Sequence, residues 1–430
     1  MTDKPLTILH SSDWHLGHTL MGRRRHDEFA HFLDWLNGAI TEHGVDVLLV
    51  SGDIFDSSIP SNAAQSLYFD FLTKVWRAGV CRHIVVIAGN HDSPSLLNAP
   101  ASLLKALNIH VVGCMTESIK DEVVVLHDRN DAPELVVGAI PYLREKDIRV
   151  IGDNESAEDK EKQLIASTRD HIRAVCAEAL VQRDKLATNV QRDKLATKPP
   201  MVVMGHLYSS GSSVADGDGD GTRKLYVGSL VEIGADAYSA GCDYVALGHI
   251  HVPQAVGGKD HIRYSGSPLP MGFHEDAQQK GVNLIRFAPE RSIEQLPVPQ
   301  FRRILSITGD RENLLSQVAE LAKSGDRVWL EIIYDSTEPM GDLRDQLNKA
   351  VAGSHTEILC TKTARGQFHA LNADVPGESL EDLTPEEVFN RCLDSHDVPA
   401  TARPTLIAAY NEILQSRQEA DTQAVEGVEA

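Results

Sequence analysis

The sequence predicts an α/β protein in which mixed β-sheets are flanked by helices, followed by a small α/β domain and two C-terminal helices. Short apolar runs rich in β-branched residues alternate with stretches whose apolar residues keep helical spacing, which is typical of strands and helices that follow one another along a chain. A β-α-β-α-β pattern recurs after residue 301. At 430 residues, the chain is long enough for two or three domains.

The clearest strand covers residues 84–88, which are apolar and lead directly into Gly89-Asn90-His91-Asp92. A short, uniformly apolar run predicts a strand buried on both faces. In open α/β sheets, ligands bind at the carboxyl ends of the strands. A single polar turn would carry little weight, because such turns are common after strands.

The same kind of ending occurs five times, and in four cases a glycine precedes the first polar residue. The polar side chains at these strand ends are Asp13, His15, Asp53, Asp56, Asn90, His91, His206, His249 and His251. Carboxylate, amide and imidazole groups are metal ligands, and five independent turns would not be expected to converge on them. The pattern therefore predicts a metal site at one edge of the sheet.

The remaining elements of the first 290 residues follow in order. Helical spacing predicts helices over 29–40, 62–77, 100–107 and 155–198, and apolar runs predict strands at 109–113, 123–126 and 135–141 with further short strands over 254–287. Ser93-Pro94 is expected to break the chain before the third helix. The acidic turn between 123–126 and 135–141 predicts an antiparallel hairpin, so that a sheet beginning β-α-β becomes mixed.

Two local features are interpreted as surface structure. The segment QRDKLAT occurs at 182–188 and again at 191–197, a spacing too short for a repeat domain. We expect this duplication to lengthen a surface helix or its trailing loop. Residues 216–221 match the start of an EF-hand loop, but Val227 stands where a bidentate glutamate is needed, which predicts a flexible loop.

The C-terminal part predicts a small domain and two helices. Strands are expected at 304–307, 328–334 and 357–361, and helices at 311–323, 340–352, 379–394 and 404–418. The last dozen residues contain four acids and no base, which predicts disorder. The expected boundaries are 1–290, 301–375, 376–416 and 417–430.

The net charge of −21 argues against a protein that coats nucleic acid by bulk attraction, but it leaves local contact open. Arg23, Arg24 and Arg25 lie beside the first candidate ligands. They form either a solvated surface loop or a clamp for the phosphate backbone, which the planar guanidinium group suits.

The sequence also predicts a cytoplasmic protein without membrane contact. No apolar run approaches the roughly 20 residues that a membrane-spanning helix needs. The N-terminus lacks the apolar region and cleavage site of a signal peptide. The six cysteines form no C-x-x-C pair, which favours reduced thiols.

Two divalent ions about 3.5–4 Å apart can bind both the attacking and the leaving oxygen of a phosphoryl transfer. Such a site needs one carboxylate that bridges the ions, and Asp53 is the natural candidate because its strand is expected to be central. Mixed Asp, Asn and His ligands favour Mn²⁺ or Fe²⁺ over a thiolate-bound metal.

The five blocks, in this order over residues 6–251, resemble those of the calcineurin-like metallophosphoesterases. The resemblance implies that family's sandwich of mixed β-sheets flanked by helices. It also implies one ion held by Asp13, His15, Asp53 and His251, and a second held by Asp53, Asn90, His206 and His249. His91 would then stabilise the phosphate charge or protonate the leaving oxygen, oriented by Asp56.

Residues 13–17, 89–93, 244–249 and the run Tyr264-Ser265-Gly266-Ser267-Pro268 are similar to the bacterial double-strand-break repair nucleases, over about residues 5–415. This narrower resemblance implies a Mn²⁺-dependent, ATP-dependent 3′→5′ double-strand exonuclease and single-strand or hairpin endonuclease, active in DNA repair, replication and recombination. It implies that residues 301–375 form a capping domain that contacts DNA ends and hairpins. Residues 376–416 would dock on an SMC-like ATPase, in a heterotetramer that contains a homodimer of this chain.

Two other classes of function stay open from the residues alone. One is a phosphatase or phosphodiesterase that acts on a small molecule or a protein, and the other is a non-catalytic scaffold of the same fold. An intact ligand set argues against a scaffold, since a scaffold needs no metal ligands. Activity on double-stranded DNA compared with p-nitrophenyl phosphate separates the two enzymes, and metal content separates both from the scaffold.

Overall fold

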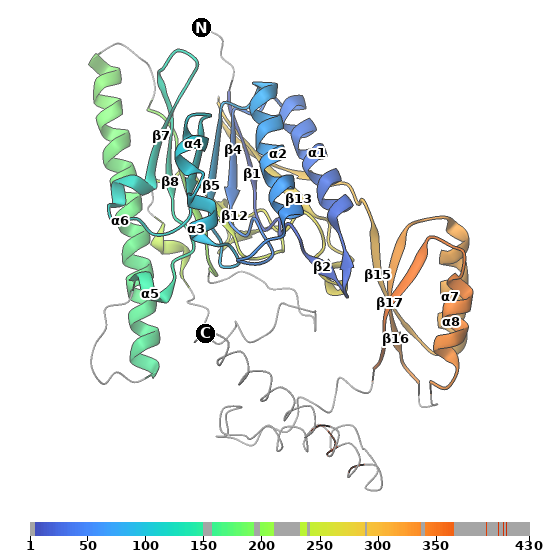
Figure 1. The fold of residues 1–430 in the computed structure, drawn as a ribbon. Helices are drawn as coiled ribbons and strands as arrows, with labels where there is room; N and C mark the ends of the chain where they lie inside the picture. Colours follow the sequence, from blue (N-terminus) through green and yellow to red (C-terminus); the bar gives the residue numbers. More distant parts are fainter. Residues whose placement is uncertain are drawn as a thin grey trace, which may run out of the picture. The chain divides into compact units, whose positions relative to one another are not determined.

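The computed structural model describes residues 5–148, 157–192, 198–209, 233–238, 241–288, 290–336 and 340–364, with four single residues beyond (393, 403, 407 and 410). It divides into two compact units, Met1–Leu305 and Ser306–Ala430 (Figure 1). The predicted loop at 216–221, the two C-terminal helices and the acidic tail lie outside the described residues, apart from those four.

The first unit contains two six-stranded sheets. The first sheet has the order β14-β13-β1-β4-β5-β6. Its strands are β1 (Leu6–Ser11), β4 (Val47–Ser51), β5 (His83–Ile87), β6 (Ile109–Val112), β13 (Gly281–Phe287) and β14 (Arg291–Pro297). From β1 to β6 the strands are parallel, whereas β13 and β14 pair antiparallel. The predicted mixed sheet is confirmed.

The second sheet has the order β11-β12-β10-β9-β8-β7. Its strands are β7 (Val123–His127), β8 (Pro133–Ala139), β9 (Met201–His206), β10 (Tyr244–Gly248), β11 (Gln254–Val256) and β12 (Lys259–Tyr264). The predicted hairpin of β7 and β8 is antiparallel, as expected. It belongs to this second sheet, however, and the first sheet becomes mixed through β13 instead.

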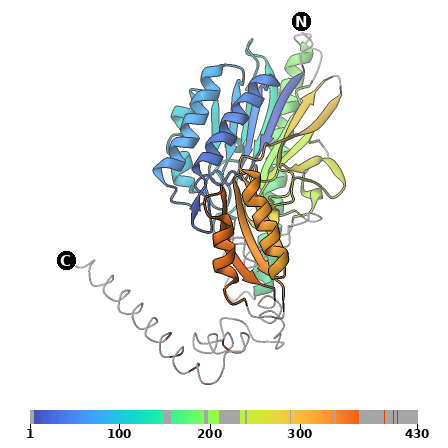
Figure 2. The ribbon, with the colours of Figure 1, turned by 90° about the vertical axis from the view of Figure 1, so that its right-hand side faces the viewer.

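The two sheets pack face to face through a shared apolar layer. Ile8, Val47 and Val85 of the first sheet meet Val202 and Tyr244 of the second in one buried cluster. Helices cover both outer faces: α1 (His26–Glu42) and α2 (Asn62–Ala78) cover the first sheet, and α6 (Ala157–Arg192) covers the second (Figures 1 and 2). The result is a four-layered α-β-β-α sandwich.

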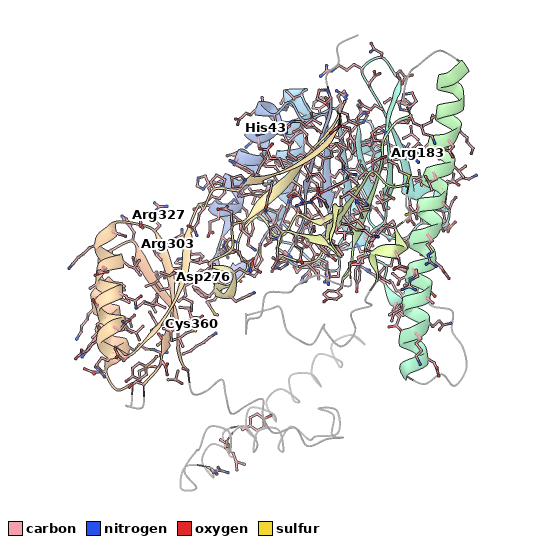
Figure 3. The ribbon with its side chains drawn as sticks, turned by 180° about the vertical axis from the view of Figure 1, so that it is seen from behind. His43, Arg183, Asp276, Arg303, Arg327 and Cys360 are labelled. Atoms are coloured by element: carbon pink, nitrogen blue, oxygen red, sulfur yellow. The ribbon has the colours of Figure 1, made fainter. Side chains whose placement is uncertain are left out.

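The long helix α6 contains the first copy of the duplicated segment QRDKLAT, whereas most of the second copy lies outside the described residues. Arg183 of α6, which is labelled in Figure 3, donates to the carbonyl oxygen of Gly241 at 2.9 Å. This contact and the apolar face of α6 attach the helix to the second sheet. Among the helices of the described residues, none is long and apolar enough to cross a lipid bilayer.

One expectation about local structure is wrong. Ser93-Pro94 begins a helix instead of breaking the chain, because the Ser93 hydroxyl caps the N-terminus and proline is favourable in the first turn. Two short helices, α3 (Pro94–Asn98) and α4 (Ala101–Lys105), replace the single helix expected over 100–107. Smaller elements complete the unit: β2 (Thr19–Leu20), β3 (Arg23–Arg24), α5 (Glu145–Ile148), and the 3₁₀ turns η1 (Ile119–Glu122), η3 (Ala235–Ala237) and η4 (Phe273–Glu275).

The second unit has a three-stranded sheet of order β15-β16-β17. The strands β15 (Arg303–Gly309), β16 (Val328–Tyr334) and β17 (Thr356–Thr363) alternate with α7 (Arg311–Ser324) and α8 (Leu343–Val351), which confirms the predicted β-α-β-α-β order. Both helices lie on one face of the sheet (Figures 1 and 2). Asp310 accepts a hydrogen bond from Asn313 N at 2.9 Å and so caps α7.

Candidate metal centre

The carboxyl ends of five strands from the two sheets meet in the first unit. β1, β4 and β5 are parallel in one sheet, β9 and β10 are parallel in the other, and the sheets face each other. Candidate ligand atoms lie within 4.8 Å of one another in three groups, namely Asp13–His15–His251, His15–Asp53–His91 and Asp53–His206–His249. Asn90 joins the third group, since its Oδ1 is 3.1 Å from His206 Nε2. The structure thus brings together all the side chains that the sequence singled out as ligands.

The backbone at this edge is held in unfavourable conformations. Asp13, His15, Asp53 and His249 have φ angles of 53°, 47°, 49° and 102°. Non-glycine residues rarely adopt positive φ, and each such residue costs about 1–3 kcal/mol unless its surroundings fix it. Asp13 N donates to Gly52 O and His15 N donates to Asp53 O, both at 3.0 Å, so the two strand ends hold each other. Strain of this kind is concentrated at functional sites.

Two of the glycines before the polar residues are required by close approach. Gly52 has a φ of 85°, and a Cβ atom there would overlap the His206 ring. A Cβ atom on Gly89 would overlap the Asp53 carboxylate. The glycines therefore allow candidate ligands from neighbouring strands to converge.

The group around His206 has the donor set of a cation site. His206 Nδ1–H donates to the Ser51 carbonyl oxygen at 2.8 Å, which leaves Nε2 with a lone pair. That lone pair faces Asn90 Oδ1 at 3.1 Å and Asp53 Oδ2 at 3.3 Å. Three acceptors that converge in a buried site need positive charge between them, which a metal ion or a proton can supply. Burial lowers the pKa of His206, but the Asp53 carboxylate outweighs burial and raises that pKa to about 9, so without an ion a proton on Nε2 takes this place.

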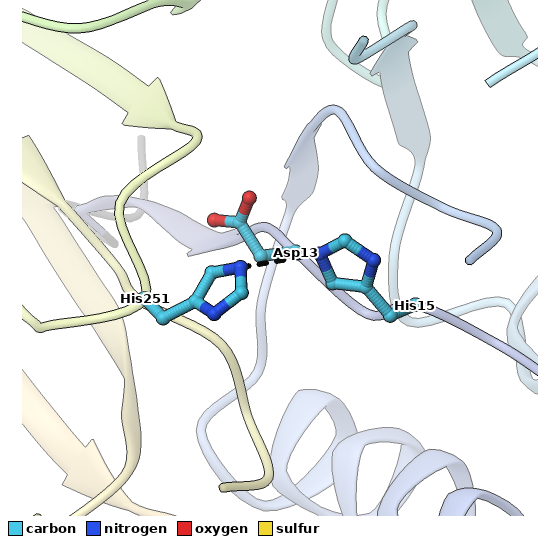
Figure 4. A group of neighbouring side chains, drawn as sticks. All are labelled: Asp13, His15 and His251. Atoms are coloured by element: carbon cyan, nitrogen blue, oxygen red, sulfur yellow. Dashed lines mark hydrogen bonds between the residues drawn. The ribbon is translucent and has the colours of Figure 1, made fainter. Parts of the chain in front are cut away.

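The group around His251 shows the same pattern (Figure 4). His251 Nε2 lies 3.2 Å from His15 Nε2, while its Nδ1 faces Glu275 Oε1 at 3.2 Å. Asp53 Oδ2, which faces His206, is also 3.6 Å from His15 Nε2. One carboxylate oxygen therefore reaches both groups, which is the position that a bridging ligand would need. The residues present fit two cations.

His91 lies beside His15 and Asp53, and its ring packs edge-on against His15 with the centroids 4.9 Å apart. Its Nδ1 donates to the main-chain carbonyl of Asp56 at 2.9 Å, and its backbone N donates to Asp53 Oδ1 at 2.9 Å. Asp56 thus contacts His91 through the main chain. The Asp56 carboxylate instead bonds His18 Nδ1 at 3.0 Å. Burial opposes its ionisation, but His15 and His18 hold its pKa well below the usual range.

The three arginines expected to act together have different environments. Arg23 and Arg24 form strand β3 of a small hairpin and are exposed. Arg25 is only 2% exposed, which contradicts both its assignment to a surface loop and its assignment to a DNA clamp. Its guanidinium pairs with Glu28 at 2.8 Å and donates to Pro270 O at 2.5 Å. Arg25 therefore holds the loop at Pro270 in place.

Sequence reasoning missed several residues that support the site. In the sequence Asp92 is only the end of a polar block, yet its buried carboxylate accepts from the backbone N–H groups of Gly89, Ile54 and Phe55. Glu275 and Lys280 lie in a stretch interpreted as short strands and turns. Most of their sequence neighbours, such as His274, Asp276, Gln278 and Gln279, are also polar, so the sequence gives no signal that would have indicated either of them.

The fold and the cluster define a metal-dependent phosphoesterase. Residues 6–253 match the model of the calcineurin-like phosphoesterase family, and residues 300–397 match a family described as the type 5 capsule protein repressor C-terminal domain, SbcD_C. The D subunit of the nuclease SbcCD from Escherichia coli (strain K12) is 32% identical, over 96% of this chain and 98% of that protein.

Two further relatives carry the same name. The Rhodobacter capsulatus protein is 29% identical over 89% of this chain and 93% of its own length, and the Bacillus subtilis protein is 34% identical over 66% and 67%. The chain belongs to the calcineurin-like phosphoesterases and, within them, to the SbcD family.

Proposed function

We propose that this chain is the nuclease subunit of an SbcC–SbcD complex and hydrolyses DNA phosphodiester bonds at a site that holds two divalent ions. The convergence of buried acceptor atoms from five strand ends on Asp53 carries this proposal, because a pair of cations satisfies them all. The names of the relatives support the substrate, since each is the D subunit of an SbcCD nuclease.

Each ion has a defined set of ligands in this proposal. Asp13, His15, Asp53 and His251 hold the first ion, and Asp53, Asn90, His206 and His249 hold the second. Bound ions polarise the phosphodiester and activate water for attack at neutral pH. Mn²⁺ is the favoured ion, because carboxylate, amide and imidazole ligands suit it and the described cluster contains no thiolate.

His91 acts on the phosphate in this proposal. Because its Nδ1–H is engaged by the Asp56 carbonyl, Nε2 is the atom available to stabilise phosphate charge or to protonate the leaving oxygen. Asp56 fixes that ring position through its main chain and aligns His18 through its carboxylate.

In this proposal, the SbcC–SbcD complex determines how the chain binds DNA. With a net charge of −21, the isolated chain should bind DNA weakly, through local contacts that include Arg23 and Arg24. Residues 301–375 contact DNA ends and hairpins, and residues 376–416 dock on SbcC. Two copies of this chain and the ATPase form the heterotetramer, which acts in the cytoplasm as an ATP-dependent 3′→5′ double-strand exonuclease and hairpin endonuclease in repair, replication and recombination.

The test is an assay of the co-purified complex on end-labelled double-stranded DNA and hairpins, with and without Mn²⁺ and ATP, beside p-nitrophenyl phosphate. Mn²⁺-dependent DNA cleavage stimulated by ATP is the expected result. Turnover of p-nitrophenyl phosphate alone would indicate a phosphatase, and metal-free protein without activity would indicate a scaffold. Truncation at Ala373 should keep basal Mn²⁺-dependent cleavage and abolish the ATP-dependent part; a truncated chain that still co-purifies with SbcC would contradict the docking assignment.

A further inference from the structure

A buried ion pair lies beside His251. Glu275 is 1% exposed and Lys280 is 4% exposed, and Lys280 Nζ lies 2.6 Å from Glu275 Oε2. Removing two charges from water carries a desolvation cost that their mutual attraction often only offsets, so a buried pair is weak support for stability in itself. The role of the pair is therefore better indicated by the residues that it contacts.

Both members of the pair hold His251. Glu275 Oε1 faces the ring at Nδ1 at 3.2 Å, and Lys280 Nζ donates to the His251 carbonyl oxygen at 3.0 Å. The backbone N of Ser267, in the run Tyr264-Ser265-Gly266-Ser267-Pro268, donates to the same oxygen at 3.2 Å. The side chain and the main chain of one candidate ligand are thus fixed together.

The contact with Glu275 also determines which nitrogen of His251 carries the proton. A carboxylate only accepts, so Nδ1 carries the hydrogen and Nε2 keeps its lone pair, directed at His15 Nε2. Carboxylates that bond the second nitrogen of a metal-binding histidine fix its tautomer and orientation and raise its basicity.

We propose that the Glu275–Lys280 pair positions His251 for the first ion, and so determines the affinity for that ion without affecting the second. This inference rests on the proposed two-ion site and identifies two positioning residues for it. Neither residue touches the reacting atoms.

Glu275→Gln distinguishes this role from packing, because the two oxygens of Glu275 have different partners. Oε2 accepts from two donors, Lys280 Nζ and, at 2.9 Å, Met271 N. The single oxygen of glutamine should therefore occupy the position of Oε2. The amide NH₂ then faces His251 Nδ1 and donates to it, which moves the histidine proton to Nε2 and blocks the ligand atom.

Glu122 offers a matched control in the same unit. Its buried carboxylate also bonds one histidine and one backbone amide, with His171 Nε2 at 2.8 Å and Thr116 N at 2.9 Å. Neither partner is a candidate ligand. Glu122→Gln therefore reproduces the loss of a buried carboxylate without any change at His251.

The experiment is a Mn²⁺ titration of the full-length, metal-free chain. Calorimetry measures the binding of each ion, and electron paramagnetic resonance shows whether the bound ions are coupled. Wild type and Glu122→Gln should bind two ions per chain and give the spectrum of a coupled pair. Glu275→Gln should bind one ion with unchanged affinity and the other about 10- to 100-fold more weakly. Glu275→Asp, which keeps the charge, should weaken the same ion less than Glu275→Gln does.

Identical titrations for wild type and folded Glu275→Gln, or weaker binding by Glu275→Asp than by Glu275→Gln, would overturn the inference. A wild type that binds fewer than two ions would instead overturn the proposed function. One measurement needs no change at Glu275: the ring ¹⁵N signals of His251 in metal-free wild type, assigned by comparison with His251→Ala. They should show hydrogen on Nδ1, and hydrogen on Nε2 alone would also overturn the inference.

Discussion

Asp92→Ala should both destabilise the chain and weaken metal binding. The Asp92 carboxylate is fully buried and accepts from Gly89 N at 2.8 Å, Phe55 N at 2.9 Å and Ile54 N at 3.1 Å. It thereby ties the loop after β4 to the loop after β5. These two loops carry Asp53 and Asn90, so loss of the tie should loosen two of the proposed ligands of the second ion.

The size of the effect follows from the three amides. Each buried N–H group left without a partner costs about 1–3 kcal/mol, and partial entry of water should limit the sum to about 3–5 kcal/mol. In the metal-free chain, burial and the Asp53 charge raise the pKa of Asp92 to about 6, above its unfolded value of about 3.9. The contribution of Asp92 to the free energy of unfolding should thus be complete below about pH 4 and should decrease as the pH rises through 6.

The assay is urea unfolding of the metal-free variant at several pH values, paired with Mn²⁺ calorimetry. Asp46→Ala is the matched control, since Asp46 is 3% exposed and accepts from Thr7 N at 3.0 Å, at the opposite ends of the strands. The control should lose about 2–4 kcal/mol and keep its Mn²⁺ affinity. Equal losses of Mn²⁺ affinity in both variants, or a loss of stability below about 1 kcal/mol for Asp92→Ala, would refute the reasoning.

The remaining predictions concern His91, the proposed catalytic histidine, and the arginines. His91→Ala should retain two Mn²⁺ ions and lose about 10²–10⁴-fold in turnover, because its role lies in the transition state; purification with fewer than two ions would make His91 a ligand instead. Replacing Arg23 and Arg24 together by alanine should reduce the salt dependence of DNA binding by about one unit of slope for each phosphate that is no longer bound, and an unchanged slope would make this hairpin ordinary solvated surface. Arg25→Ala should lower the unfolding temperature through its broken pair with Glu28; a salt slope that changes while the unfolding temperature does not would restore Arg25 to the DNA surface.

The sequence was most informative where structure is local. The uniformly apolar run 84–88 indicates burial on both faces, and the apolar spacing within 62–77 indicates burial of one helix face. The structure has a strand and a helix close to these positions. The convergence of polar strand ends was also predictable, because parallel strands present their carboxyl ends at one edge. The ligand roles of Asp53 and its neighbours stay predictions, although the structure brings the side chains together.

What the sequence could not show depends on contacts between distant residues. Arg25 is buried and donates to the carbonyl oxygen of Pro270, which lies 245 positions further along the chain. The hairpin of β7 and β8 joins the second sheet because β8 pairs with β9, a pairing that periodicity does not encode. Glu275 becomes meaningful only once His251 and Lys280 are seen beside it.

The central claim is a pair of ions bridged by Asp53, and it is tested most directly by Mn²⁺ binding to wild type and Asp53→Ala. Wild type should bind two ions per chain and show a spin-coupled pair, because one carboxylate oxygen of Asp53 faces both ligand groups. Asp53→Ala should show no coupled pair and no nuclease activity. Two bound ions in Asp53→Ala with the coupled spectrum intact would contradict the account.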